Sequence, residues 1–235
     1  MPSLRDIQLR INGLQTTEKI TNVMKMIAIT KYRRLTSPFQ TINKFANHFQ
    51  ETRKYMRPHP TGDKKYLIAF APTRGLCASL NTKFDRFLKE HHEEHSLILI
   101  KQDTILSSDF FHDIIQKIQK FSDIKIAYVQ FISTAQHIVK EEIIFPWTYQ
   151  DDQNFYAIHD IYDKDQWFNN YLLLSLYKGL LNTQISENAA RMLAMDNASK
   201  NATNIIQGLK LSYNKKRQEI ITKEIIETGF SIYGE

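Results

Sequence analysis

The chain has 235 residues, a net charge of +6, 42% hydrophobic residues and 11% aromatic residues, a composition that can form a packed core and excludes a disordered chain. Its apolar runs fall far short of the roughly 20 residues that span a bilayer, so no transmembrane helix is predicted. The single cysteine, Cys77, excludes an internal disulfide, and the first residues lead us to expect no leader for export or organelle import.

A long N-terminal helix is predicted first, because residues 3–37 contain no proline. Ser3 is a predicted N-cap with Asp6 in the first turn. Pro38 is expected to bend or interrupt this helix without ending it. Apolar residues at coiled-coil spacing form a predicted seam, the line of contact with a partner helix, at Leu4, Ile7, Ile11 and Leu14, and again at Ala28, Tyr32, Leu35, Phe39 and Ile42.

Polar residues interrupt this seam at Glu18, Thr21 and Lys25. There a neighbouring apolar face is predicted to replace it, as in a coiled-coil stutter; that face comprises Ile20, Val23, Met24 and Ile27. Residues 1–57 hold eleven Lys and Arg against three Asp and Glu. This basic excess favours an acidic partner, and its sign alone does not choose among nucleic acid, anionic lipid and an acidic protein surface.

The middle of the chain predicts a small α/β domain, because segments with strand and helix patterns alternate. Its sheet is expected to be largely parallel. The predicted strands are Leu67–Phe70, Ser96–Ile100, Ile124–Ile132 and Ile143–Phe145. The predicted helices are Ser79–His92, Phe110–Lys120 and Ala135–Glu142. Its aromatic residues are interpreted as core rather than as a base-stacking surface, because basic residues do not interleave with them.

A second long helix is predicted from about Asp165 to Thr228, a stretch without proline. At 1.5 Å per residue it would be roughly 95 Å long, far more than the radius of gyration of about 18 Å expected for a compact chain of this length. We therefore expect it to project and to pack antiparallel to the first helix. Its predicted seam comprises Met192, Met195, Ala198, Ala202, Ile205 and Leu209.

The fold class predicted from these elements is α/β, with an antiparallel two-helix coiled coil and an inserted small α/β (Rossmann-like) domain. The predicted domains are 1–57 for the N-terminal helix, 58–164 for the inserted domain and 165–235 for the C-terminal helix.

Catalytic, cofactor-binding and metal-binding motifs are not found in the sequence. Arg74-Gly-Leu-Cys77 could present backbone amides to an anion, but a tight turn between strand and helix is the favoured interpretation. His91-His-Glu-Glu-His95 fails the zinc-helix pattern, which needs Glu directly after the first His. Cys77 is interpreted as a buried thiol.

Three stretches resemble the gamma subunit of the F-type ATP synthase. They are about 50 residues at the N-terminal end, about 50 residues at the C-terminal end, and a short segment between them. The matching text is Thr17-Glu-Lys-Ile-Thr-Asn-Val-Met-Lys-Met-Ile-Ala28 near the N-terminus, Ser186–Ala202 and Leu211–Glu227 in the C-terminal helix, and Leu67–Leu80 between them. Thr73 stands where the family usually has Asp, and Ala78 where it usually has Gly.

This resemblance implies a non-catalytic rotating shaft that couples proton flow to ATP synthesis and hydrolysis. Its implied partners are the alpha and beta subunits of the catalytic hexamer, the epsilon subunit and the membrane c-ring. It implies no nucleic acid and no cofactor. The implied location is peripheral, on the cytoplasmic face of the bacterial inner membrane, or alternatively on the matrix side of the mitochondrial inner membrane. The residues implied to contact the surrounding subunits are Met24, Lys25, Arg191, Arg217, Gln218, Thr222 and Glu227.

Two other classes remain as alternatives. A basic coiled-coil protein that binds nucleic acid would lose affinity steeply with salt. A small α/β enzyme with helical arms would need a ligand at the carboxyl ends of its strands.

Overall fold

A computed structural model describes residues 3–55, 62–73, 75–77, 79–91, 95–101, 108–118, 121–148 and 164–232. Within these residues the chain forms two compact units, one made of residues 1–27 and 193–235 and the other of residues 28–192. The division cuts across both long helices, α1 (Leu4–Thr52) and α5 (Lys164–Ile232). The domain boundaries predicted at residues 57 and 164 therefore stay a prediction.

The unit of residues 28–192 contains a four-stranded sheet in the order β2-β1-β3-β4. The strands are β1 (Lys64–Phe70), β2 (Ser96–Ile100), β3 (Phe121–Phe131) and β4 (His137–Phe145). β1 pairs in parallel with β2 and β3, and β4 pairs antiparallel with β3. The expected largely parallel sheet is thus confirmed for three strands, with an antiparallel strand at one edge.

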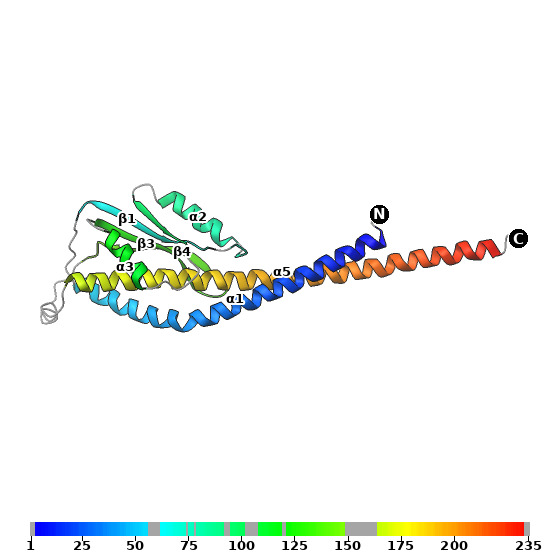
Figure 1. Cartoon of the computed structure of the whole chain (residues 1–235), viewed down its shortest axis with the longest axis horizontal. Helices are drawn as coiled ribbons and strands as arrows, with labels where there is room; N and C mark the ends of the chain where they lie inside the picture. Colours follow the sequence, from blue (N-terminus) through cyan, green and yellow to red (C-terminus); the bar gives the residue numbers. More distant parts are fainter. Residues whose placement is uncertain are drawn as a thin grey trace. The chain divides into compact units, whose positions relative to one another are not determined.

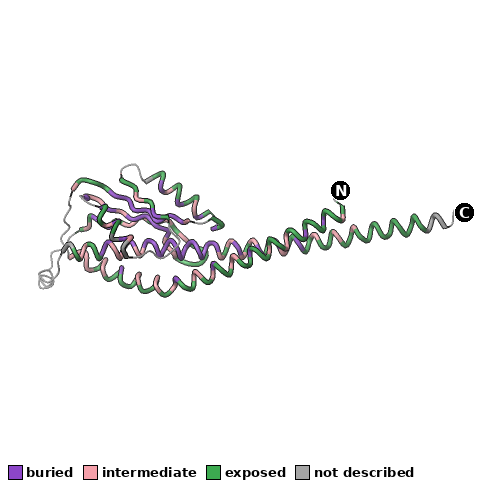
Figure 2. The backbone as a smooth tube through the Cα atoms, viewed as in Figure 1, coloured by how far each residue is buried: buried purple, intermediate pink, exposed green. Residues whose placement is uncertain are grey.

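Helices cover both faces of this sheet (Figure 1). α2 (Leu80–His91) packs Phe84 and Leu88 on one face, against Leu67 and Val129. On the other face, α3 (Ser108–Lys117) and the first half of α5 pack against the larger apolar cluster. Colouring by burial marks the central strands and this part of α5 as buried (Figure 2). The seven aromatic residues interpreted as core lie in or beside this cluster and its neighbour. They are Tyr66, Phe70, Phe84, Phe87, Phe110, Phe111 and Phe121.

α5 approaches the sheet closely at Gly179. A Cβ atom built there would lie 2.7 Å from Cδ2 of Phe70 and 3.2 Å from Cγ2 of Ile126. Phe70 is completely buried, so its ring has little space to move. A glycine is therefore required for the helix to lie this near to the strands, although glycine weakens a helix interior.

The helix predicted over Ala135–Glu142 is wrong, because this stretch forms β4. Residues 132–136 make the turn of a hairpin, in which Ile132 N and Ser133 N both donate to Gln136 O. β4 then pairs with β3 from Phe131↔His137 to Ile124↔Phe145. Lys140, Glu141 and Glu142 favour a helix by propensity, but pairing with a buried strand decides the structure.

Other predicted elements are confirmed. As expected, α1 does not end at Pro38, but it runs through this residue as one helix, so the expected interruption is wrong. Its N-terminus is capped reciprocally, with Asp6 N donating to Ser3 Oγ at 3.1 Å and Ser3 N donating to Asp6 Oδ2 at 2.9 Å. α5 extends the predicted C-terminal helix to 69 residues. Among the described helices, none has an apolar stretch of the length needed to cross a membrane.

Candidate functional site

Polar pairs join the two helices of the coiled-coil unit where the apolar seam is interrupted. Each pair has one residue on α1 and one on α5 and is called a polar rung here. The rungs are Glu18 with Thr203 at 2.6 Å, Asn22 with Ser199 at 3.0 Å, and Lys25 with Asp196 at 2.6 Å. The numbers rise on α1 and fall on α5 by the same steps, which confirms the antiparallel packing.

The rung of Lys25 and Asp196 is an ion pair. Lys200 Nζ also lies 2.6 Å from Asp196 Oδ2, so the carboxylate is held between two ammonium groups. Hydrogen bonds from Lys200 and Lys25 lower the pKa of Asp196 to about 2. Lys25, a predicted contact residue, is therefore half-buried within the coiled coil, and its charge is engaged by α5.

Apolar side chains beside the polar rungs point outward. Ile20, Val23 and Ile27 are 55%, 59% and 52% exposed. Their steps of 3 and 4 put them on one face of α1, and at about 100° per residue this face lies opposite the rungs. The expectation that these residues replace the seam is therefore wrong, because Glu18, Asn22 and Lys25 line the seam instead. The helix is polar toward its partner and apolar toward solvent over this stretch.

Nearer the N-terminus of α1, apolar side chains line the contact between the two helices. Ile7 and Ile11 pack against Ile206, with Leu14, Leu209 and Tyr213 at the edge of the cluster. On α5 the predicted seam is wrong at one position, because Ile205 is 52% exposed and Ile206 is buried. The buried α5 positions Met195, Ser199, Ala202 and Ile206 include a polar residue, Ser199, which an apolar pattern does not detect.

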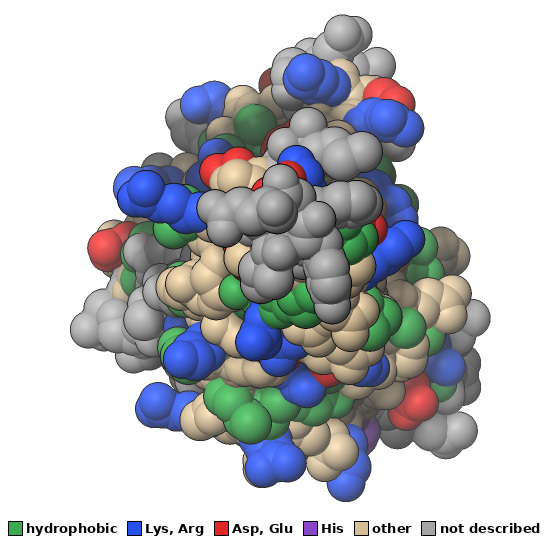
Figure 3. All heavy atoms as spheres, turned by 90° about the vertical axis from the view of Figure 1, so that its right-hand side faces the viewer, with side chains coloured by type: hydrophobic (Ala, Val, Ile, Leu, Met, Phe, Trp, Pro, Cys, Tyr) green, Lys and Arg blue, Asp and Glu red, His purple; other side chains and the backbone are tan. Residues whose placement is uncertain are grey.

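The C-terminal part of α5 is exposed from Arg217 to Thr228, as Figure 2 shows in green. Four isoleucines there have accessible side chains, Ile220, Ile221, Ile225 and Ile226. Continuing the register of the rungs puts the first residue of α1, Leu4, opposite about position 217, so this part of α5 has no facing α1 residue. A space-filling view toward this end shows Lys and Arg side chains with apolar side chains between them (Figure 3).

Two of the predicted contact residues, Gln218 and Thr222, lie on one face of this exposed helix, and Glu227 lies roughly 140° around the helix from Thr222 at about 100° per residue. Gln218, Thr222 and Glu227 line a shallow depression together with Lys215, Glu219, Lys223 and Ile226. Glu227 also pairs with Lys223 at 3.6 Å. Arg217 is exposed as well, and at about 100° per residue it lies roughly 140° from Thr222 and roughly 80° from Glu227 around the helix. Met24 on α1 is half-buried.

Arg191, the remaining predicted contact residue, is buried among groups of its own chain. Its guanidinium pairs with Glu187, donates to Asn188 Oδ1 at 3.2 Å, and donates to Gly75 O at 3.4 Å. Glu187 also accepts a hydrogen bond from Thr73 N at 3.1 Å. Arg191 thus fastens α5 to the loop after β1, and its contact with another subunit stays a prediction.

Polar side chains of α5 occupy the carboxyl ends of the parallel strands. Thr183 Oγ1 donates to Phe70 O at 3.2 Å and accepts from Val129 N at 3.1 Å. Ser186 Oγ donates to Val129 O at 3.2 Å. A ligand of an open α/β sheet would bind at these strand ends, and here the chain's own helix fills that position. The geometry therefore gives the α/β-enzyme alternative no open site at these two strands.

The structure also bears on the sequence features that were considered as metal-binding or reactive sites. In the part of the chain that the structure describes, no three His, Cys, Asp or Glu residues lie close enough together to hold a metal ion. Arg74 and residues 92–94 of the His-Glu motif lie outside the described residues. Cys77 is buried, as predicted, and burial followed by the nearby charge of Glu187 raises its pKa, which disfavours a reactive thiolate.

Comparisons with known proteins agree on one family. The model of the family described as ATP synthase matches residues 3–106 and 98–229. The mitochondrial ATP synthase subunit gamma of Drosophila melanogaster is 28% identical over 264 residues, covering 97% of this chain and 89% of that protein. The ATP synthase gamma chain of Malacoplasma penetrans is 25% identical over 288 residues, and both chains are covered completely.

Solved structures share the fold. A chain in the cryo-EM structure of the Euglena gracilis mitochondrial ATP synthase, comprising OSCP, F1 and c-ring in rotational state 3, superposes with a TM-score of 0.73 at 18% identity. The match covers 98% of this chain and 94% of that chain. A chain of the rotor of the same enzyme in rotational state 1 matches with a TM-score of 0.70 at 16% identity, covering 93% and 98%.

Proposed function

This chain belongs to the ATP synthase family, as a relative of its gamma subunits, and from this premise we propose that it is the central rotating shaft of an F-type ATP synthase. The shaft couples proton flow through a membrane c-ring to ATP synthesis and hydrolysis in a hexamer of alpha and beta subunits. The observation that carries the proposal is the reversed polarity of the coiled coil, with polar rungs inside and Ile20, Val23 and Ile27 outside.

Exposed isoleucine and valine side chains favour burial, at roughly 25 cal/mol per Å² of apolar surface removed from water. Ile20, Val23 and Ile27 form such a surface on α1, and Ile221 and Ile225 are further exposed apolar side chains on α5. A surrounding ring of subunits would cover these faces, and the contacts would differ as the shaft turns. Differential contact with each subunit state is what couples rotation to a conformational change.

We propose that the predicted contact residues add polar contacts with the surrounding subunits to those of the apolar surface. Gln218 and Thr222 share one face of α5, so a single loop of a neighbouring subunit could contact both. Arg217 and Glu227 lie on another side of the helix and would meet different groups, and there the Arg217 guanidinium could hold a carboxylate in a bidentate pair. Met24 and Lys25 would contribute from α1, and Arg191 would act by holding α5 in place.

No catalytic, cofactor-binding or metal-binding residue is assigned to this chain, because we propose that the alpha and beta subunits carry the chemistry. Further proposed partners are the epsilon subunit and the c-ring, through which the chain would be peripheral to a membrane. Relatives occur in bacteria and in mitochondria. We place this chain on the cytoplasmic face of a bacterial inner membrane, with the mitochondrial matrix side as the alternative. Family membership decides against the nucleic-acid alternative.

Reconstitution with the cognate alpha and beta subunits tests the proposal. We expect one copy of the chain inside an alternating hexamer, with ATP hydrolysis that depends on it and ATP-driven rotation of a bead attached to it. The chain alone should not hydrolyse ATP. A folded chain that neither assembles with the hexamer nor changes its turnover would overturn the proposal.

Substitutions on the two surfaces sharpen this test. Gln218→Ala and Thr222→Val should each reduce ATP-driven rotation while the chain stays folded, and Val23→Ser should weaken assembly. Ile138→Ser is the matched control, because Ile138 on β4 is similarly exposed, at 49%, but lies outside the proposed contact faces. If Gln218→Ala and Thr222→Val both rotate like the unmodified chain, the contact assignment on α5 is wrong.

A further inference from the structure

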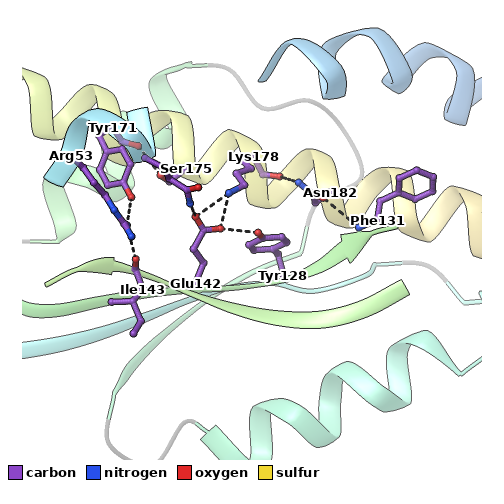
Figure 4. A network of polar contacts seen from close by, with 10 residues as sticks. Arg53, Tyr128, Phe131, Glu142, Ile143, Tyr171, Ser175, Lys178 and Asn182 are labelled. Atoms are coloured by element: carbon purple, nitrogen blue, oxygen red, sulfur yellow. Dashed lines mark hydrogen bonds and ion pairs between the residues drawn. The ribbon is translucent and has the colours of Figure 1, made fainter. Parts of the chain in front are cut away.

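The unit of residues 28–192 contains a buried ionic cluster that the proposed contacts do not use. At its centre is the carboxylate of Glu142 on β4. Lys178 on α5 donates to both carboxylate oxygens, at 2.9 and 2.8 Å, and Tyr128 on β3 donates to Oε2 at 2.8 Å. Gln50 on α1 donates to Oε1. We call these four residues the Glu142 clamp, and Figure 4 labels Glu142, Lys178 and Tyr128.

The clamp joins four separate elements through one side chain. Glu142 and Lys178 have side chains that are 10% and 12% exposed. Burial by itself would raise the pKa of Glu142, but the charge of Lys178 and the hydrogen bonds from Lys178 and Tyr128 hold this pKa below its ordinary value. The carboxylate is therefore charged at neutral pH, and its bonds to the helices are charge-assisted and directional.

A second set of bonds lies beside the clamp in Figure 4. Arg53, just after α1, donates from Nη1 to Tyr171 OH on α5 at 2.8 Å and to Ile143 O on β4 at 3.1 Å. The adjacent β4 residues Glu142 and Ile143 are thus both tied to the α1 segment and to α5. Sliding or turning of either helix on the sheet would break these bonds.

Stability alone does not explain a buried ion pair at this position. An apolar pair of similar volume is often equally stable or more stable, because the two charges lose their hydration. Hydrogen bonds between charged groups fix the orientation of the groups they join, whereas apolar contacts do not. The reason is that a hydrogen bond weakens steeply when its distance or angle changes. A cluster that meets α1, α5 and the sheet at one point therefore fixes how the helices are oriented on the sheet.

We propose that Glu142 is a positioning residue that transmits torque between the sheet and the paired segments of α1 and α5. This inference rests on the proposed function as a rotating shaft and adds a site to it. The clamp holds both helices in one rotational setting on the sheet, so a twisting force applied to the sheet reaches the helices without slippage.

The test measures torsional stiffness in the reconstituted complex of this chain with alpha and beta subunits. The hexamer is fixed to a surface, and a bead is attached through Lys89→Cys, an exposed position on α2. The angular variance of the bead during pauses reports stiffness. We expect Glu142→Gln and Lys178→Met each to raise this variance about twofold, because each breaks the charge-assisted network, and the double variant to add little more.

Two further variants separate positioning from stability. Glu141→Gln is the matched control, because Glu141 lies next to Glu142 and pairs with Lys125 at 2.9 Å, but that pair joins only β4 to β3. It should leave the variance unchanged. Glu142→Leu with Lys178→Met should restore the unfolding stability by replacing both charges, while the variance stays raised.

Each outcome decides something. Rotation by the unmodified chain with equal variance in Glu142→Gln and Glu141→Gln would overturn the clamp and leave the proposed function standing. The same holds if Glu142→Leu with Lys178→Met rotates with the unmodified variance, because packing alone would then suffice. Failure of the unmodified chain to rotate would instead overturn the proposed function and the clamp's role in it.

Discussion

The two compact units bury opposite kinds of side chain where their helices meet a partner. In the unit of residues 28–192, α5 packs Leu172, Leu176 and Leu180 on the sheet. The same unit encloses the ion pairs of Glu142 with Lys178 and of Glu187 with Arg191. Over residues 18–25 of the other unit, the helices meet through polar rungs, and isoleucine and valine face solvent. A helix pair of this second kind gains little from its own packing, which suits a surface made for contact with other subunits.

This contrast predicts that core truncations are costly in the sheet unit. Leu176→Ala removes a side chain with no exposure and should lower the free energy of unfolding by about 3 kcal/mol through lost transfer energy and the cavity that remains. Denaturant unfolding followed by circular dichroism measures the change. Leu211→Ala on the same helix is the control, because Leu211 is 72% exposed, and a change within about 0.5 kcal/mol is expected there.

The ionic cluster should make the sheet unit sensitive to acid. The pKa of Glu142 in the folded chain lies below its ordinary value of 4.5. The stabilisation it provides is therefore present above about pH 4.5 and is lost as the pH falls through the lowered folded pKa. Glu142→Gln should destabilise the unit by about 2 kcal/mol at pH 7, because it leaves Lys178 buried without its counter-charge.

The measurement is the free energy of unfolding as a function of pH, compared between the unmodified chain and Glu142→Gln. The variant should show a flatter dependence between pH 5 and pH 3, because the titrating carboxyl is gone. Hydrogen exchange resolved along the chain assigns the loss to β3, β4 and the first half of α5. Parallel curves for the two proteins would contradict a lowered pKa at Glu142.

The close packing of α5 on the sheet leads to a prediction with a smaller effect on stability. Gly179→Ala should destabilise the chain by about 1 kcal/mol, since the clash with Phe70 costs about 1–3 kcal/mol and the better helix propensity of alanine returns part of it. Gly208→Ala is the control, because a Cβ atom there meets nothing within 4 Å. That variant should stabilise α5. Thermal unfolding of both variants gives the sign, and equal shifts would rule out the close contact.

The sequence predicted the long helices and most of the sheet because their signals are local. Proline-free stretches and apolar spacing locate α1 and α5, and short apolar runs locate the strands. The end of β4 was predicted as the strand Ile143–Phe145. The earlier part of β4 was missed, because Lys140, Glu141 and Glu142 favour helix locally and the pairing with β3 depends on the rest of the sheet. The interruption of the seam was visible at Glu18, Thr21 and Lys25. The polar contacts with α5 were not visible, because an apolar pattern ignores Ser199, which pairs with Asn22, and Thr203, which pairs with Glu18.

The candidate contact residues were inferred from the resemblance to the gamma subunit. The structure divides them into exposed residues on α5 and residues that are buried or half-buried. Gln218 and Thr222 share a face, as their spacing of four residues along a helix allows, and Glu227 lies on another side. The burial of Arg191 could not be predicted, because it depends on Gly75, 116 positions earlier. The exposed face of Ile20, Val23 and Ile27 was recognised as an apolar face but assigned to the seam. The polar residues on the opposite side of α1 were the signal that this side, and not the apolar one, faces α5.

The smallest predicted effect tests the polar rungs themselves. Glu18→Leu with Thr203→Val replaces one rung by apolar side chains and should stabilise the coiled coil by up to about 1 kcal/mol, since both polar partners are removed together. Thr203→Val alone should destabilise it slightly by leaving Glu18 without its hydrogen bond. Hydrogen exchange along α1 and α5 measures both. If the double variant stabilises the helix pair but reduces ATP-driven rotation, the rungs serve the moving contact rather than the strength of the coiled coil, and if it destabilises the pair, the rungs contribute to folding.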